Sequence, residues 1–87
     1  MRIDVYLKLI GIFKTRSAAG RAASGGFVSM DGRKLKPSHT VSGNEVITVV
    51  RPDGSSLSIR VTDIPATGQV SRKDRQRYFS VVEDPGR

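Results

Sequence analysis

The chain has 87 residues, enough for one hydrophobic core, and its Val, Ile and Leu residues occur in patterned runs, unlike those of a disordered chain. It contains no cysteine, so a disulfide framework and a thiolate-bound zinc ion are excluded. No apolar run at the N-terminus is long enough for a signal peptide or a membrane span. We therefore expect a cytoplasmic protein with a single domain over residues 1–82 and a frayed tail at 83–87.

The net charge of +7 is distributed unevenly along the chain. Residues 1–36 carry a net charge of +6, residues 37–71 a net charge of −1, and residues 72–87 a net charge of +2. Basic charge gathered in this way favours a polyanionic partner such as a nucleic acid, although positive charge alone also keeps many small proteins in solution.

A first helix is predicted over residues 2–10, because apolar side chains recur there at helical spacing and form one face. That face consists of Ile3, Leu7 and Ile10. The charged residues of the segment lie off the apolar face: Arg2, Asp4 and Lys8. Gly11 ends the helix, and Ile12 and Phe13 in the turn that follows are expected to plug the core.

A second helix is predicted within "FKTRSAAGRAASGG", residues 13–26. Thr15 is a suitable N-cap, with Ser17 as the alternative, and either of the two final glycines can supply a left-handed C-cap. On a helical wheel one half is made of alanines: Ala18, Ala19, Ala22 and Ala23. Arg16 and Arg21 lie on the other half. We therefore predict a helix with a small inner face and a basic outer face.

From Phe27 onward the side-chain pattern has a period of two, which is typical of strands. Two short strands around Asp31 and Gly32 predict a hairpin, because a type I′ turn needs positive φ at both central residues. Further strands are predicted at 44–51, 56–61 and 78–82, with loops at 37–43 and 62–71 and a charged turn or short helix at 72–77. This order predicts an α+β fold, with two short N-terminal helices packed on a small, mostly antiparallel β-sheet.

The residues do not form a recognisable catalytic or cofactor site. The histidine, His39, lies in a loop rich in Pro, Ser and Thr, where a surface position is expected, and a metal site needs more ligands. The segment "GRAASGG" lacks the phosphate-loop pattern and ends a helix instead of beginning one. We therefore expect a binding protein with no catalytic activity, cofactor, metal ion or small-molecule substrate.

The basic residues are the positive signal for function. Arg16 is expected in the first turn of the second helix, where backbone N–H groups can also meet a phosphate. Arginine suits bidentate phosphate contacts, and lysine supplies a point charge. The aromatic residues are expected in the core: Tyr6, Phe13, Phe27, Tyr78 and Phe79. With few rings left for base stacking, structured RNA recognised through its shape and phosphates is favoured over single strands.

Four short motifs occur in order over residues 1–50. They are R-x-D-x-x-L near the start, F-K-T-R-S-x-A, G-x-V-x-x-D-G and the segment "KPSHTVSGNEV". Each is weak alone, but together they resemble the S-four (S4) RNA-binding domain, also called the αL motif. The chain is also similar to short stand-alone members, of which one type acts in ribosome-associated quality control and another is a heat-shock protein that binds free large ribosomal subunits.

The resemblance implies an RNA face formed by the second helix and the following hairpin. By this resemblance the residues expected to contact RNA are Arg2, Lys14, Arg16, Ser17 and Arg21. Lys8, Lys34 and Lys36 are included because of their positive charge and not because of a motif. Val5 stands where many members have lysine, and Asn44 where aspartate is common.

The ligands that the resemblance implies are ribosomal RNA of the large subunit and tRNA, with a quality-control tailing factor as a partner at stalled, peptidyl-tRNA-bearing subunits. We expect a monomer that does not bind membranes. The alternatives are a heat-shock-type large-subunit binder and a general structured-RNA-binding protein. A DNA-binding protein is disfavoured because neither helix carries a set of side chains for base readout. Because the chain begins with its own Met1, we do not expect a fragment of an enzyme.

Overall fold

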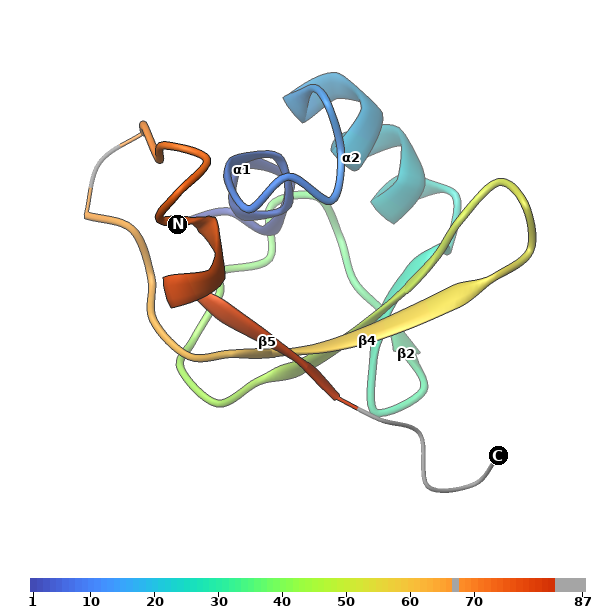
Figure 1. Cartoon of the computed structure of the whole chain (residues 1–87). Helices are drawn as coiled ribbons and strands as arrows, with labels where there is room; N and C mark the ends of the chain where they lie inside the picture. The colour runs from blue at the N-terminus through green and yellow to red at the C-terminus, as the bar shows by residue number, and fades with distance from the viewer. Residues whose placement is uncertain (67, 83–87) are drawn as a thin grey trace.

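The structure, a computed structural model, describes residues 1–66 and 68–82. Two helices lie over one five-stranded sheet, and a turn of 3₁₀ helix precedes the last strand (Figure 1). The elements are α1 (Ile3–Leu9), α2 (Arg16–Ser24), β1 (Val28–Met30), β2 (Arg33–Lys34), β3 (Val46–Val50), β4 (Ser56–Val61), η1 (Arg75–Arg77) and β5 (Phe79–Val82). The predicted α+β fold is confirmed. The predicted domain bounds of 1–82 stay a prediction, and the tail predicted at 83–87 lies outside the described residues.

Both ends of α2 are closed by local hydrogen bonds. The N–H of Ala18 donates to the Oγ1 of Thr15 at 3.0 Å, which confirms Thr15 as the N-cap. At the other end Gly26 has a φ of 86°, a left-handed conformation that glycine adopts without steric cost. The N–H of Phe27 then donates back to the carbonyl of Ala22 at 2.9 Å. This is the Schellman arrangement, and it ends α2 after nine residues.

The sheet has the strand order β2-β1-β3-β4-β5, and every neighbouring pair is antiparallel. Asp31 and Gly32 connect β1 to β2 with φ values of 53° and 78°, which confirms the type I′ turn. The β3–β4 hairpin is the longest, and its turn reaches up beside the C-terminal end of α2 (Figure 1). That turn forms one wall of a groove described below.

The hydrophobic core lies between the helices and one face of the sheet. The strands contribute Val28, Ile47, Val49, Ile59 and Val61, all fully buried. The helices contribute Ile3, Tyr6, Leu7, Ala19 and Ala23. Because α2 buries only methyl groups, it can lie close to its neighbours, as the alanine pattern predicted.

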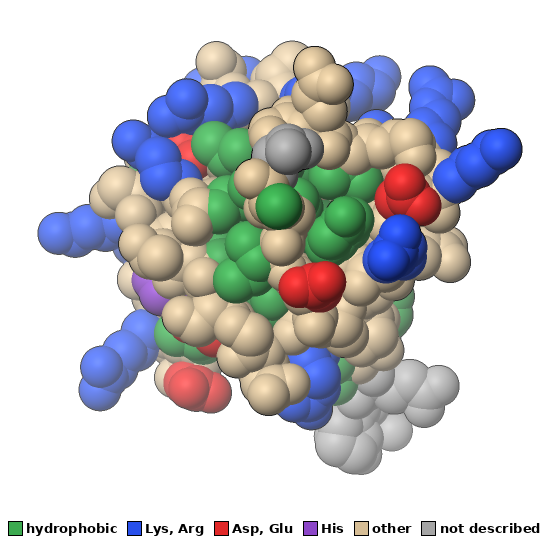
Figure 2. All heavy atoms as spheres, turned by 90° about the vertical axis from the view of Figure 1, so that its left-hand side faces the viewer, with side chains coloured by type: hydrophobic (Ala, Val, Ile, Leu, Met, Phe, Trp, Pro, Cys, Tyr) green, Lys and Arg blue, Asp and Glu red, His purple; other side chains and the backbone are tan. Residues whose placement is uncertain are grey.

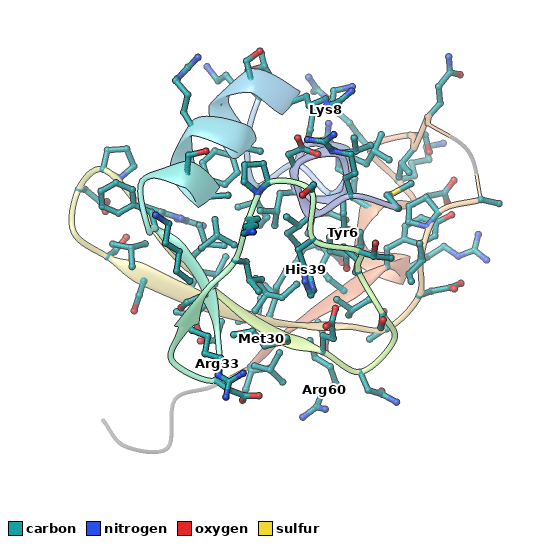
Figure 3. The ribbon with its side chains drawn as sticks, turned by 180° about the vertical axis from the view of Figure 1, so that it is seen from behind. Tyr6, Lys8, Met30, Arg33, His39 and Arg60 are labelled. Atoms are coloured by element: carbon teal, nitrogen blue, oxygen red, sulfur yellow. The ribbon has the colours of Figure 1, made fainter. Side chains whose placement is uncertain are left out.

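The buried face of α1 is wider than predicted. Asp4 and Leu9 are buried in addition to the apolar face and to Tyr6, which the sequence placed in the core. Tyr6 lies beneath the helix toward the sheet, whereas Lys8 stands on its outer side (Figure 3). The Tyr6 hydroxyl donates to the carbonyl of Tyr78 at 2.6 Å, so the segment before β5 covers this side of the helix. Burial raises the pKa of the Tyr6 phenol well above its ordinary value, and the negative charge of Asp63 raises it further, which keeps the hydroxyl a donor.

One aromatic residue is not in the predicted place. Phe27 was expected in the core, but it is 49% exposed, so this prediction is wrong. The chain turns sharply at Gly26 before β1, and the Phe27 ring lies against Gly25 at the end of α2 instead of between the helices and the sheet. Tyr6 is buried as predicted, and the other aromatic side chains are half-buried against the core: Phe13, Tyr78 and Phe79.

The loop after β2 packs against the N-terminus of the chain. The carbonyl of His39 accepts a hydrogen bond from the N–H of Ile3 at 2.8 Å, and Thr40 forms an isolated antiparallel bridge with Arg2. His39 reaches the surface only in part, because its side chain is 23% exposed and its Nε2 lies 3.1 Å from the Oε2 of Glu45. The loop therefore holds the start of α1 in place.

The charged turn or short helix predicted at 72–77 is η1 with the turn before it. Gly11 follows α1 with a φ of 85°, and a Cβ at that position would lie only 2.7 Å from the Nη1 of Arg75. The Arg75 side chain therefore crosses the backbone at the end of α1. This contact explains why a residue without a side chain stands there.

Candidate nucleic-acid interface

A buried carboxylate joins two arginines at the starts of the two helices. The Oδ2 of Asp4 lies 3.1 Å from the Nη2 of Arg2 and 3.5 Å from the Nε of Arg16. Asp4 is 4% exposed, whereas the side chains of Arg2 and Arg16 are 47% and 57% exposed. The carboxylate thus lies inside and the guanidinium groups lie at the surface. We call these three residues the Arg2–Arg16 cluster.

The position of Asp4 is set by both helices. Its Oδ1 accepts a hydrogen bond from the N–H of Val5 at 2.8 Å, within the first turn of α1, where negative charge is favoured. The second helix passes close by at Gly20, where a Cβ would lie 3.9 Å from the Oδ2 of Asp4. The small residues of α2 therefore bring Arg16 within reach of a carboxylate on α1.

The cluster leaves positive charge and hydrogen-bond donors at the surface. Asp4 carries one negative charge against two positive ones. No described residue accepts a hydrogen bond from the terminal nitrogens of Arg16, or from the backbone N–H of Arg16 or Ser17 in the first turn of α2. Guanidinium and helix N-terminal donors at one place form a suitable site for a phosphate.

The remaining predicted residues on or next to α1 and α2 face different neighbours. Lys8 is exposed in the last turn of α1. Lys14 and Arg21 line a groove between α2 and the β3–β4 turn. Arg16 and Arg21, which the helical wheel placed on one outer half, are thus turned toward different sides. Arg16 reaches α1 and Arg21 reaches the groove.

The hairpin lysines lie toward the opposite end of α2. Lys34 is exposed on β2, and a Cβ on Gly26 would lie 3.9 Å from its Cδ, so its stem runs past the end of the helix. Lys36 is exposed just after β2. The structure therefore brings Arg2 and Arg16 together and spreads the other cations along the helices and the hairpin.

Sequence reasoning missed the role of Asp4. It placed this residue among the charged side chains off the apolar face of the first helix, and its burial shows that a solvent position is wrong. The available signal was the motif R-x-D, which puts a carboxylate two residues after an arginine. Only the packing of α2 over this position excludes water from Asp4 and adds Arg16 as a second partner.

Basic side chains also border the face formed by the chain after β4. Figure 2 shows Lys and Arg side chains mainly around the margin of this face, several of them along its upper, helix-bearing edge.

Across residues 1–66 and 68–82, no group of three or more His, Asp and Glu side chains could hold a metal ion. Neither helix in this part of the chain is long and apolar enough to cross a membrane.

Two short helices on an antiparallel sheet, with arginines at the helix starts, define a small basic α+β domain suited to nucleic acid. Residues 1–47, which include the whole Arg2–Arg16 cluster, match the S4 domain family. The chain therefore belongs to the S4 domain family, as the motifs predicted.

The chain is also similar in sequence and structure to individual known proteins. Over 80 residues the chain is 32% identical to the Helicobacter pylori (strain J99) protein named RQC P-site tRNA stabilizing factor, covering 92% of this chain and 94% of that protein. The fold resembles Vibrio cholerae heat shock protein 15, solved as a trimer, with a TM-score of 0.83 and 28% identity over 94% of this chain and 81% of that one. It also resembles the solution structure of the hypothetical protein HP1423, with a TM-score of 0.81 and 28% identity over 97% of this chain and 99% of that one.

Proposed function

We propose that the chain binds structured RNA, specifically ribosomal RNA of the large subunit, and that the Arg2–Arg16 cluster is the centre of the interface. The observation that carries this proposal is the pairing of arginines from two helices on one buried carboxylate. The pairing holds two planar donor groups in place before a ligand arrives. Less side-chain entropy is then lost on binding than with freely moving arginines.

The proposed interface extends beyond the cluster along both helices and the first hairpin. Its further members are Lys8, Lys14, Ser17, Arg21, Lys34 and Lys36. Their charges suit phosphates, and phosphate contacts orient a protein on its RNA without reading the sequence. We therefore propose recognition of RNA shape, with tRNA as a second ligand.

The cellular role that we propose is assistance to large subunits that carry a stalled peptidyl-tRNA, in the cytoplasm, beside a tailing factor that performs the chemistry. The relative named RQC P-site tRNA stabilizing factor supports this role. The chain itself would bind and not catalyse. A second candidate is a heat-shock-type subunit binder independent of stalling, which the TM-score of 0.83 to heat shock protein 15 favours.

Sedimentation with purified ribosomal subunits tests the role. We expect the chain to co-sediment with large subunits and not with small subunits, and to do so more strongly when the large subunits hold peptidyl-tRNA. Equal binding to large subunits with and without peptidyl-tRNA would favour the heat-shock-type role. Recovery of the chain only in the free fraction would contradict both.

A substitution at Asp4 tests the positioning argument within the cluster. We expect Asp4→Asn to weaken RNA binding about tenfold, a free-energy change of about 1.4 kcal/mol, although it removes a negative charge. The neutral amide no longer holds two guanidinium groups in place, so the cost of ordering them returns. Fluorescence anisotropy with a labelled fragment of large-subunit RNA measures this at fixed salt.

The matched control for this experiment is Asp31→Asn, which removes the same charge from the β1–β2 turn, where asparagine fits the left-handed conformation equally well. Its RNA affinity should be unchanged or slightly higher. If Asp4→Asn also bound RNA more tightly, Asp4 would act only as an unfavourable charge.

A further inference from the structure

On the side of α2 away from α1 lies an open groove that the Arg2–Arg16 cluster does not use. It is bounded by the loop before α2, by α2 itself and by the β3–β4 turn, and its volume is about 800 Å³. That volume is within the range of known ligand sites. Its floor and walls are mainly apolar, with side chains that include Ile12, Phe13, Ala18, Ala22, Phe27 and Val49.

Phe27 is the most prominent apolar side chain at the groove. Among the described residues it is one of two large hydrophobic side chains that stand exposed, the other being Val81. Its ring is held against the end of α2, because a Cβ on Gly25 would lie only 2.9 Å from a ring carbon. A partner would therefore meet an aromatic ring that is already positioned, and such rings dominate the energetics of many protein interfaces.

The rim of the groove is positively charged. Lys14, Arg21 and Arg51 line it, and none of them forms an ion pair with another described residue. The one acidic side chain of the lining, Asp53, is engaged within its own turn. Its Oδ1 accepts hydrogen bonds from the hydroxyl of Ser55 at 2.6 Å and the N–H of Ser55 at 2.8 Å, and these bonds lower the pKa of Asp53. The positive charge of Arg51 also lowers the pKa of Asp53, and three cations against one carboxylate leave a net positive charge at the rim.

We propose that this groove is a docking site for an acidic, amphipathic segment of a protein partner. The apolar side chains of the segment occupy the groove, and its carboxylates face the three cations of the rim. A nucleobase fits less well, because its polar edges would lose water against the mainly apolar floor and walls of the groove. An apolar side chain has no such cost.

The docking site and the Arg2–Arg16 cluster at the centre of the proposed RNA interface lie on different sides of α2. Arg2 and Arg16 face α1, whereas Phe27 and Arg51 belong to the groove. Lys14 and Arg21 line the groove and are also members of the proposed RNA interface, so the two surfaces meet at these residues. The chain can therefore hold RNA at the Arg2–Arg16 cluster and a protein segment at Phe27 and Arg51, which suits an adaptor on a large RNA.

The binding test uses the ¹⁵N-labelled full chain and NMR. The probe is a synthetic amphipathic peptide of 18 residues with leucines at i, i+3, i+4 and i+7 and glutamates on the opposite face, compared with the same peptide carrying lysines for glutamates. We expect saturable shifts confined to the amides around the groove with the acidic peptide only. Absence of saturable binding, shifts centred elsewhere, or equal binding of the basic peptide would overturn the proposal.

Substitutions separate the groove from the RNA interface. Phe27→Ala and Arg51→Glu should each lower the peptide affinity about tenfold or more. The matched controls, Val81→Ala and Arg60→Glu, should leave it unchanged, since Val81 lies on the edge strand β5 and Arg60 on the sheet face away from the helices. Arg16→Ala should leave peptide binding intact while weakening RNA binding, so the two proposals can fail independently. If the two controls lowered the affinity as much as the groove variants, the proposal would be wrong.

Two other occupants are distinguished by the same spectra. Groove shifts produced by a short single-stranded RNA, and not by the acidic peptide, would assign the groove to RNA and overturn the proposal. Groove shifts that depend on the concentration of the chain alone would assign the groove to a second copy, with the same consequence.

Discussion

Replacing Arg16 by alanine is expected to lower the affinity for structured RNA about tenfold to a hundredfold. The substitution removes a charged donor group from the centre of the proposed interface, and hydrogen bonds to charged groups contribute about 1.5–3 kcal/mol each. One phosphate contact fewer should also reduce the slope of log affinity against log salt concentration by about one. Anisotropy titrations with a fragment of large-subunit RNA at several salt concentrations give both quantities. Asp4 retains Arg2 as a partner, so the fold should persist.

Two further variants show whether position or total charge matters. Arg16→Lys keeps the charge but loses the planar fork, and we expect an intermediate loss of affinity. Arg60→Ala removes the same charge from the far side of the sheet, where Figure 3 shows this side chain pointing away from the helices. For this variant the slope of log RNA affinity against log salt concentration should not change. If Arg60→Ala cost as much affinity as Arg16→Ala, binding would follow net charge and the proposed interface would be wrong.

Replacing Tyr6 by alanine is expected to lower the free energy of unfolding by about 3–5 kcal/mol. Tyr6 is fully buried between α1 and the sheet, and its hydroxyl connects α1 to the segment before β5. Removing the ring leaves a cavity at the centre of a small core. For a domain of this size such a loss is a large fraction of the total stability. Urea denaturation followed by circular dichroism measures it.

The phenylalanine variant isolates the hydroxyl. Tyr6→Phe should cost only about 1 kcal/mol, because the carbonyl of Tyr78 also accepts hydrogen bonds from the N–H of Thr62 at 3.0 Å and of Asp63 at 3.3 Å. The acceptor is therefore not left unpaired. Equal losses for Tyr6→Phe and Tyr6→Ala would mean that the hydrogen bond, and not the packing of the ring, provides the stabilisation.

The raised pKa of Tyr6 predicts that the free energy of unfolding depends on pH. The pKa of the Tyr6 phenol is raised in the folded chain, so the folded state favours the neutral form. Its contribution is fully present below the ordinary tyrosine pKa of about 10 and is lost as pH rises above that value. Tyr6→Phe should remove this part of the alkaline loss of stability.

The local features of the fold were predictable because a few neighbouring residues decide them. Thr15 caps α2 through a hydrogen bond three residues away, and the turn at Asp31 and Gly32 needs only residues that tolerate positive φ. The alternation in β4 likewise indicates which side chains face the core. Short motifs of the same kind predicted the family.

The candidate site was predictable only in part. Arg2 and Arg16 stood out by charge and motif, but their pairing through Asp4 did not. A helical wheel gives the direction of a side chain from the axis of its own helix and says nothing about which neighbour lies there. Arg16 and Arg21 therefore shared one predicted face, although the structure turns them toward α1 and the groove, respectively.

The sequence by itself determined the secondary structure, the hairpin geometry, the family and the basic character of the N-terminal region, since these depend on spacing and composition within short segments. Only the tertiary structure decided that Asp4 is buried, that Phe27 is exposed beside a groove and that α1 is covered by the segment before β5. Burial depends on segments distant in sequence that pack over a position. The packing of the helices on the sheet therefore determines whether Asp4 joins two arginines and whether the Phe27 ring is exposed to solvent.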